Sequence, residues 1–107
     1  RAMSTHGTIA IRRKQEKDEV FVFHVGHDGS KVGAFMLENK NPASVDELIV
    51  DTNRFCSWFR GLEISVKEFN PKEPYKNLAE YSVYYDGGSW KANFKETQYG
   101  KQWGREL

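Results

Sequence analysis

The feature that most constrains the fold is an apolar run that ends at a turn and continues with helical spacing. Residues 20–25 carry β-branched and aromatic side chains with apolar residues on both faces, which is typical of a central β-strand. A turn bracketed by glycines follows over residues 26–29, and apolar residues then recur at helical spacing over residues 32–37. We therefore expect a short helix here, with Asp28 or Ser30 as its N-cap.

Four further segments alternate apolar and polar residues and are expected to be strands. Residues 7–14 predict a half-buried strand that pairs with residues 20–25 as a hairpin. Residues 62–67 alternate in the same way and predict a strand with one wet face. Two alternating runs within residues 81–94 flank an Asp-Gly turn at residues 86–87, which predicts a second hairpin.

A second helix is predicted from residues 44–47, which have the form of a capping box with Ser44 as the N-cap. Its end is open, because residues 51–53 could break the helix or be crossed by it, and Gly61 is the first firm stop.

The predicted order of elements is strand, strand, helix, helix, strand, strand, strand. This order favours an α+β fold with an antiparallel sheet of about five strands and two helices packed on one face. We expect one domain over residues 3–107, since Arg1 and Ala2 precede Met3 and are typical of residues left by cloning. The other face of the sheet is expected to be polar and to carry Arg12, Glu63, Lys67, Lys91, Asn93 and Lys95.

The charge balance excludes a global attraction to nucleic acid or to an anionic membrane. Sixteen Lys and Arg residues against fifteen Asp and Glu residues leave a formal net charge of +1. No apolar run approaches the roughly 20 residues that span a bilayer, so we expect no membrane contact. Cys56 is the only cysteine and is expected to pack in the core; a lone thiol fits a reducing, cytoplasmic location.

One group of residues predicts an anion site. A histidine that leaves a strand and a carboxylate at a helix start can converge, and free amides at a helix N-terminus favour a phosphate. His24, His27, Asp28 and Ser30 would then bind a small nucleotide or another phosphorylated anion, to sequester or hydrolyse it. The alternative is that Asp28 only caps the helix, His27 is solvated and His24 is a cross-strand neighbour. We expect no metal site and no cofactor, because no standard ligand motif is present.

A second hypothesis is a single-stranded nucleic-acid binder. Basic residues near aromatic residues could track a phosphate backbone and stack on bases. The basic residues are Arg12, Arg13, Lys14, Lys91, Lys95, Lys101 and Arg105, and the aromatic ones are Trp90, Phe94, Tyr99 and Trp103. Acidic residues interrupt both runs, and aromatic side chains that alternate along a strand also fit a core.

The abundance of aromatic residues and arginine favours a protein partner. Tyr, Trp and Arg dominate protein interfaces because they bury a large area and keep a polar group. We expect the contact surface to include Phe55, Trp58, Arg60, Tyr84 and Trp90. Core packing is the alternative for each of them, and self-association into a homodimer is an alternative to a foreign partner.

Residues 3–12, the string His24-Val25-Gly26-His27-Asp28-Gly29 and the hairpin at residues 85–90 resemble a group of small, mostly uncharacterised proteins of bacteriophages and mobile elements. The group often has an aromatic residue before Asp-Gly, where this chain has His27. The resemblance implies a phage origin, and such proteins often bind and disable a host component. The prediction is therefore a non-catalytic inhibitor in the host cytoplasm that blocks a defence or nucleic-acid-processing protein.

Overall fold

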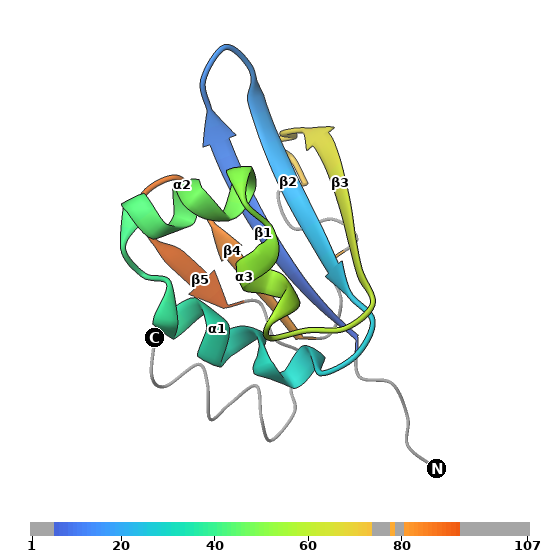
Figure 1. Ribbon diagram of the computed structural model, residues 1–107. Coiled ribbons are helices and arrows are strands. Elements are labelled where there is room, and N and C mark those ends of the chain that lie inside the picture. Colours follow the sequence, from blue (N-terminus) through green and yellow to red (C-terminus); the bar gives the residue numbers. More distant parts are fainter. Residues whose placement is uncertain (1–5, 74–77, 79–80, 93–107) are drawn as a thin grey trace.

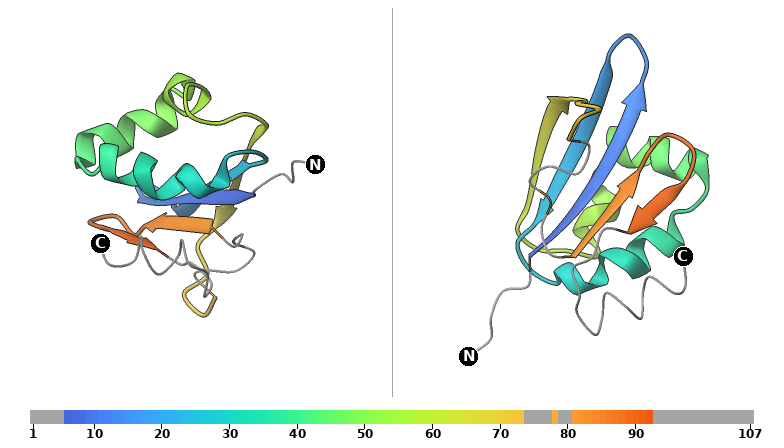
Figure 2. Two further views of the ribbon diagram at one scale, coloured as in Figure 1. Left: turned by 90° about the horizontal axis from the view of Figure 1, so that it is seen from below. Right: turned by 180° about the vertical axis from the view of Figure 1, so that it is seen from behind.

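The computed structural model describes residues 6–73, 78 and 81–92. These residues form a five-stranded sheet with helices on one face. Figure 1 shows the elements, and the left view of Figure 2 shows all the helices on the same side of the sheet. The strands are β1 (Gly7–Lys14), β2 (Asp18–Val25), β3 (Leu62–Glu68), β4 (Tyr81–Tyr85) and β5 (Trp90–Ala92). The helices are a 3₁₀ turn (Gly29–Lys31), α1 (Val32–Glu38), α2 (Pro42–Val50) and α3 (Asn53–Cys56).

The α+β class is confirmed, but the sheet is mixed and not antiparallel throughout. Its order is β3-β2-β1-β4-β5, and β1 pairs with β4 in parallel. The other three pairings are antiparallel, including the predicted hairpins β1–β2 and β4–β5. Strand β4 does not pair with β3. It lies on the other side of β1 and runs in the same direction as β3 and β1, so its pairing with β1 is parallel. Phe69 and Leu78, which lie between β3 and β4 in the sequence, pack against the sheet face opposite the helices.

Strand β1 lies at the centre of the sheet and is buried on both faces. Ile9 and Ile11 pack toward the helices, and Thr8 and Ala10 are buried on the opposite face. The prediction of a half-buried strand is therefore wrong, although the alternation that it used is correct. On the face opposite the helices, Arg12 is the first residue of β1 that is only partly buried.

The helices differ from the sequence-based expectation in number and in where they begin. Helix α2 starts at Pro42, with Asn41 as the N-cap whose side-chain oxygen accepts a hydrogen bond from the Ala43 amide. Ser44 is therefore inside the helix and does not cap it, since proline favours the first helical position. Helix α2 ends at Val50 and α3 begins at Asn53, so residues 42–56 form two helices. None of the helices in the described ranges is long and apolar enough to cross a membrane.

Asn39 connects three elements at the end of α1. Its side-chain amide donates to the Phe35 carbonyl at 2.8 Å, and its side-chain oxygen accepts from Arg54 of α3 at 2.9 Å. Its backbone carbonyl accepts from Nε1 of Trp90 in β5 at 3.0 Å. A buried amide with all of these partners is stabilising, because its polar groups are not left without hydrogen bonds.

The sheet face opposite the helices is less open than predicted. Val20, Val22, Ala10 and Tyr84 form a second buried cluster on it, and Phe69 and Leu78 pack against that cluster. The residues expected on this face divide accordingly: Arg12 is partly buried, whereas Glu63, Lys67 and Lys91 are exposed. Asn93 and Lys95 lie outside the described residues.

Gly29 fixes the turn after β2 against the start of β1. A Cβ atom at this position would lie 2.5 Å from the backbone carbonyl carbon and oxygen of His6 and 2.6 Å from the Gly7 nitrogen. No real Cβ makes contacts this short with backbone, so the first turn before α1 and the start of β1 would have to separate.

We predict that Gly29→Ala lowers the free energy of unfolding by about 3 kcal/mol, because overpacking against backbone cannot relax through a side chain. Gly88→Ala is the matched control, since its Cβ would meet only Asp86 Oδ1 at 3.9 Å. Urea unfolding of both variants measures the difference. Equal stabilities would contradict the close approach at Gly29.

Candidate functional site

The predicted anion site includes the turn after β2, where the side chains of Asp28 and His27 lie close to Arg60 and Gly61. Asp28 occupies the predicted N-cap position, at the start of the 3₁₀ turn, in a left-handed backbone conformation (φ 64°), but its side chain makes no capping hydrogen bond. Its carboxylate instead lies 3.9 Å from Nε of the exposed Arg60. His27 is exposed, and its ring lies beside Gly61, where a Cβ would meet Cδ2 of the ring at 3.4 Å.

His24 does not lie with this turn, whereas Ser30 is part of it. His24 lies on the sheet face opposite the helices, because its neighbour Phe23 packs in the helix-side core and strand residues alternate. Its Nε2 lies 3.4 Å from the Ser65 hydroxyl of β3. Ser30 belongs to the 3₁₀ turn that leads into α1 on the helix side. Among the described residues, no three His, Cys, Asp or Glu side chains are grouped to hold a metal ion.

Two of the residues expected on a contact surface are core residues in this structure. Phe55 is 0% exposed and stacks between Phe23 (ring centroids 4.1 Å apart) and Phe35 (4.9 Å). Tyr84 is 2% exposed within the second buried cluster. Neither side chain is available to a partner without unfolding, so we correct both assignments.

The other three expected contact residues reach the surface to different extents. Trp58 is partly buried with its ring edge-on to Phe35, and Trp90 is partly buried beside Tyr85. Arg60 is exposed. Cys56 is also exposed, contrary to the expectation that it packs in the core. The short helix α3 directs Phe55 inward, and its neighbour Cys56 consequently faces outward.

The basic residues of the nucleic-acid hypothesis are partly engaged within the protein. Arg12 binds Asp18 through two hydrogen bonds of 2.9 and 2.6 Å, and its guanidinium carbon lies 3.5 Å from the centre of the Phe69 ring. Lys91 lies 3.4 Å from Asp86, whose pKa is lowered by hydrogen bonds from the Ser89 and Gly88 amides. Lys95, Lys101, Arg105, Phe94, Tyr99 and Trp103 lie outside the described residues, so this hypothesis stays a prediction.

The Arg12–Asp18 pair makes stability depend on pH. The hydrogen bonds from Arg12 hold the pKa of Asp18 below its ordinary value. Because the folded pKa is depressed, the stabilisation is present at neutral pH and is lost as the pH falls through the folded pKa. We predict that Asp18→Asn is less stable than the wild type at pH 7 and that the difference disappears near pH 2. Thermal unfolding at both pH values tests this, and a difference that persists in acid would contradict it.

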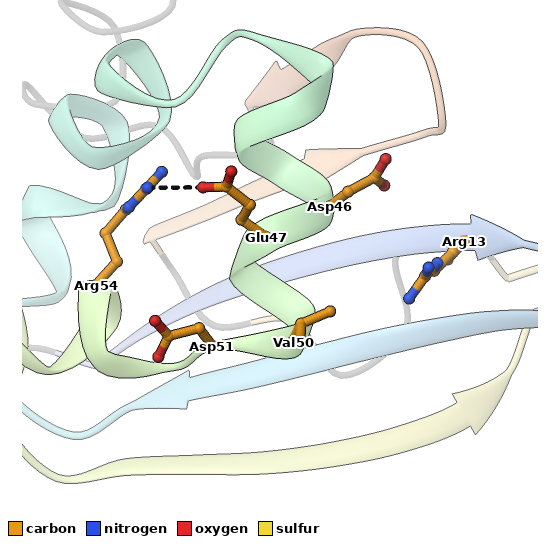
Figure 3. A pocket seen from close by; sticks show the side chains of 6 residues that line it. All are labelled: Arg13, Asp46, Glu47, Val50, Asp51 and Arg54. Carbon is orange, nitrogen blue, oxygen red and sulfur yellow. Dashed lines mark hydrogen bonds and ion pairs between the residues drawn. The ribbon is translucent and has the colours of Figure 1, made fainter.

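A hollow of about 330 Å³ lies beside the C-terminal half of α2. Figure 3 shows its lining, which comes from α2, the following turn, α3 and the end of β1. Val50, at the last position of α2, supplies the apolar surface and is 80% exposed. The charged residues of the lining are Arg13, Asp46, Glu47, Asp51 and Arg54.

The charges around this hollow are only partly neutralised by one another. Arg54 Nη2 lies 3.0 Å from Glu47 Oε2, and Nη1 of the same side chain donates a hydrogen bond to Asn39 Oδ1. Asp51 accepts a hydrogen bond from the Asn53 amide at 3.0 Å, which supports the start of α3. Asp46 is exposed on the α2 side of the hollow, and Arg13 lies across from it in Figure 3.

The surface residues that sequence reasoning missed are aliphatic and not aromatic. Val50, Ile64 (47% exposed) and Val66 (49% exposed) are the large apolar side chains that the described part of the chain leaves exposed. Ile64 and Val66 lie on the helix side of β3, which none of the labelled helices covers in Figure 1. Alternation alone placed them on a buried face, because it does not show how far the helices extend over the sheet.

Comparison with protein-family models, curated proteins and solved structures gives no match to this chain.

Proposed function

We propose that this protein is a small binding protein that docks on another protein through the hollow beside α2 and blocks it. The observation that carries the proposal is the 80% exposure of Val50 within a ring of charged side chains. A large aliphatic side chain in water costs free energy that a partner would recover on binding. An apolar centre with a charged rim is also the usual anatomy of a protein interface.

The lining favours a partner that brings an apolar side chain next to a basic one. The apolar group would cover Val50, and the basic group would face Asp46 or Asp51, which Figure 3 shows on opposite sides of Val50. Arg13 and the Glu47–Arg54 pair would make rim contacts that fix orientation and exclude like-charged partners more than they add affinity.

The resemblance to phage proteins supports a host protein as the partner. Under this proposal the chain acts by occupying a surface of a bacterial defence or nucleic-acid-processing protein. Arg60 and Trp58 remain candidates for peripheral contacts, because both reach the surface on the segment after α3. The position of His24, on the sheet face opposite the turn, makes the anion pocket the less favoured function.

We predict that Val50→Lys weakens binding of the host protein by at least about tenfold, since a charged group replaces the apolar contact. Lysine is tolerated at the end of α2 because a cation at a helix C-terminus is favourable. The measurement is affinity capture from bacterial lysate at moderate salt, with bound proteins identified by mass spectrometry and then titrated as purified partners.

Ser89→Lys is the matched control, because it adds the same charge at an exposed position in the β4–β5 turn, outside the lining of the hollow. It should bind as the wild type does. Equal retention of the partner by all three proteins, or no stoichiometric partner for the wild type, would overturn the proposal.

A further inference from the structure

Strand β3 forms an edge of the sheet and leaves its outer side unpaired within the described residues. Its neighbour is β2, and no other described strand lies beside it. The strand is seven residues long, and all but its first residue, Leu62, are exposed. A long edge of this kind is a template for another strand unless the protein protects it.

The hydrogen bonds at the two ends of the β2–β3 pairing show which backbone groups point outward. The Gly26 amide donates to the Gly61 carbonyl at 3.1 Å, and the Phe69 amide donates to the Asp18 carbonyl at 3.0 Å. In an antiparallel pair, bonded positions alternate with non-bonded ones, so the odd-numbered residues of β3 bond to β2. The amides and carbonyls of Leu62, Ile64, Val66 and Glu68 therefore point to the free edge.

We propose that β3 pairs with β3 of a second copy of this chain, antiparallel and centred on Ser65, to form a homodimer with a continuous sheet. Ser65 is the midpoint of Leu62–Glu68, so this register pairs the whole strand with its copy. The two-fold axis is perpendicular to the sheet, which places the helices of both copies on the same side. Because none of the described helices of either copy covers β3, these helices do not obstruct the pairing (Figure 1).

Charge selects this register over its neighbours. With Ser65 at the centre, Glu63 of each copy lies opposite Lys67 of the other, at a non-hydrogen-bonded position where side chains are closest. A shift that centres the pairing on Glu63 or on Lys67 places like charges opposite each other. A shift to Ile64 or Val66 leaves Glu63 or Lys67 opposite Ser65 and loses both charge pairs.

The same register also covers the exposed apolar side chains of β3. Ile64 lies opposite Val66 of the second copy, and the pair occurs twice around the axis. These two side chains are 47% and 49% exposed in the single chain. Cross-strand pairs of β-branched residues stabilise a sheet, and here they join the helix-side surfaces of the two copies into one apolar strip.

The test exchanges the charges one at a time. Glu63→Lys alone places two lysines opposite each other at both charge pairs, and Lys67→Glu alone places two glutamates there. We expect each variant to raise the dimer dissociation constant by about tenfold or more, measured by sedimentation equilibrium over a range of concentrations. Circular dichroism and thermal unfolding check that each variant remains folded.

An equimolar mixture of the two variants tests whether the charge pairs themselves determine the dimer affinity. In a mixed dimer each new lysine faces a glutamate and each new glutamate faces a lysine, so the affinity should return to within about threefold of the wild type. A loss of folding cannot produce this rescue. A wild type that stays monomeric up to about 1 mM, single variants that dimerise like the wild type, or a mixture no tighter than its components would each overturn the proposal.

A disulfide reports the register independently. In a Cys56→Ser background, Ser65→Cys places two thiols opposite each other at the axis, where Cα atoms are about 4.5 Å apart and within disulfide reach. Oxidised glutathione should then cross-link this variant and leave Glu68→Cys, at the end of the strand, uncross-linked. The reverse pattern would overturn the Ser65-centred register. None of these outcomes depends on Val50, so the dimer and the proposed function are tested independently of each other.

Discussion

The burial of β1 on both faces is the constraint on which the rest of the structure depends. A central strand needs a layer on each side, and the helices supply one through Phe35, Phe55 and Leu48. The other layer forms where Phe69 and Leu78 pack over Ala10 and Val22. Phe69 and Leu78, which form this layer, come from the sequence between β3 and β4, and β4 pairs with β1 in parallel.

The sequence predicts the local elements well because their signals are local. The strand at Gly7–Lys14 has the expected bounds, and the Asp86-Gly87 turn joins β4 and β5 as the composition indicates. The helix starts are less accurate, since Asn41 followed by Pro42 competes with the capping-box pattern at Ser44 and takes the N-cap position. The direction of β4 could not be predicted, because a proline-containing segment is compatible with either a tight return or a crossover.

Candidate sites were harder to predict, because a site depends on which side of the sheet each residue faces. His24 and Asp28 are four residues apart, yet the first lies on the face opposite the helices and the second in the turn that leads to them. Phe55 was expected outside and Cys56 inside, and the structure reverses both, because a four-residue helix gives too little periodicity to assign its faces. The exposed aliphatic residues Val50, Ile64 and Val66 depend on where the helix layer ends.

The two proposed surfaces use the same side of the sheet for different partners. The residues that line the hollow at Val50 do not include any of β3, so a dimer through β3 would present two equivalent docking sites for a host protein. The most direct measurement is amide hydrogen exchange along β3 at low and high protein concentration. We predict that the amides of Glu63, Ser65 and Lys67 are protected at both concentrations, because they bond to β2, and that Ile64 and Val66 become protected only at high concentration. Amides of Ile64 and Val66 that exchange equally fast at both concentrations would contradict the account.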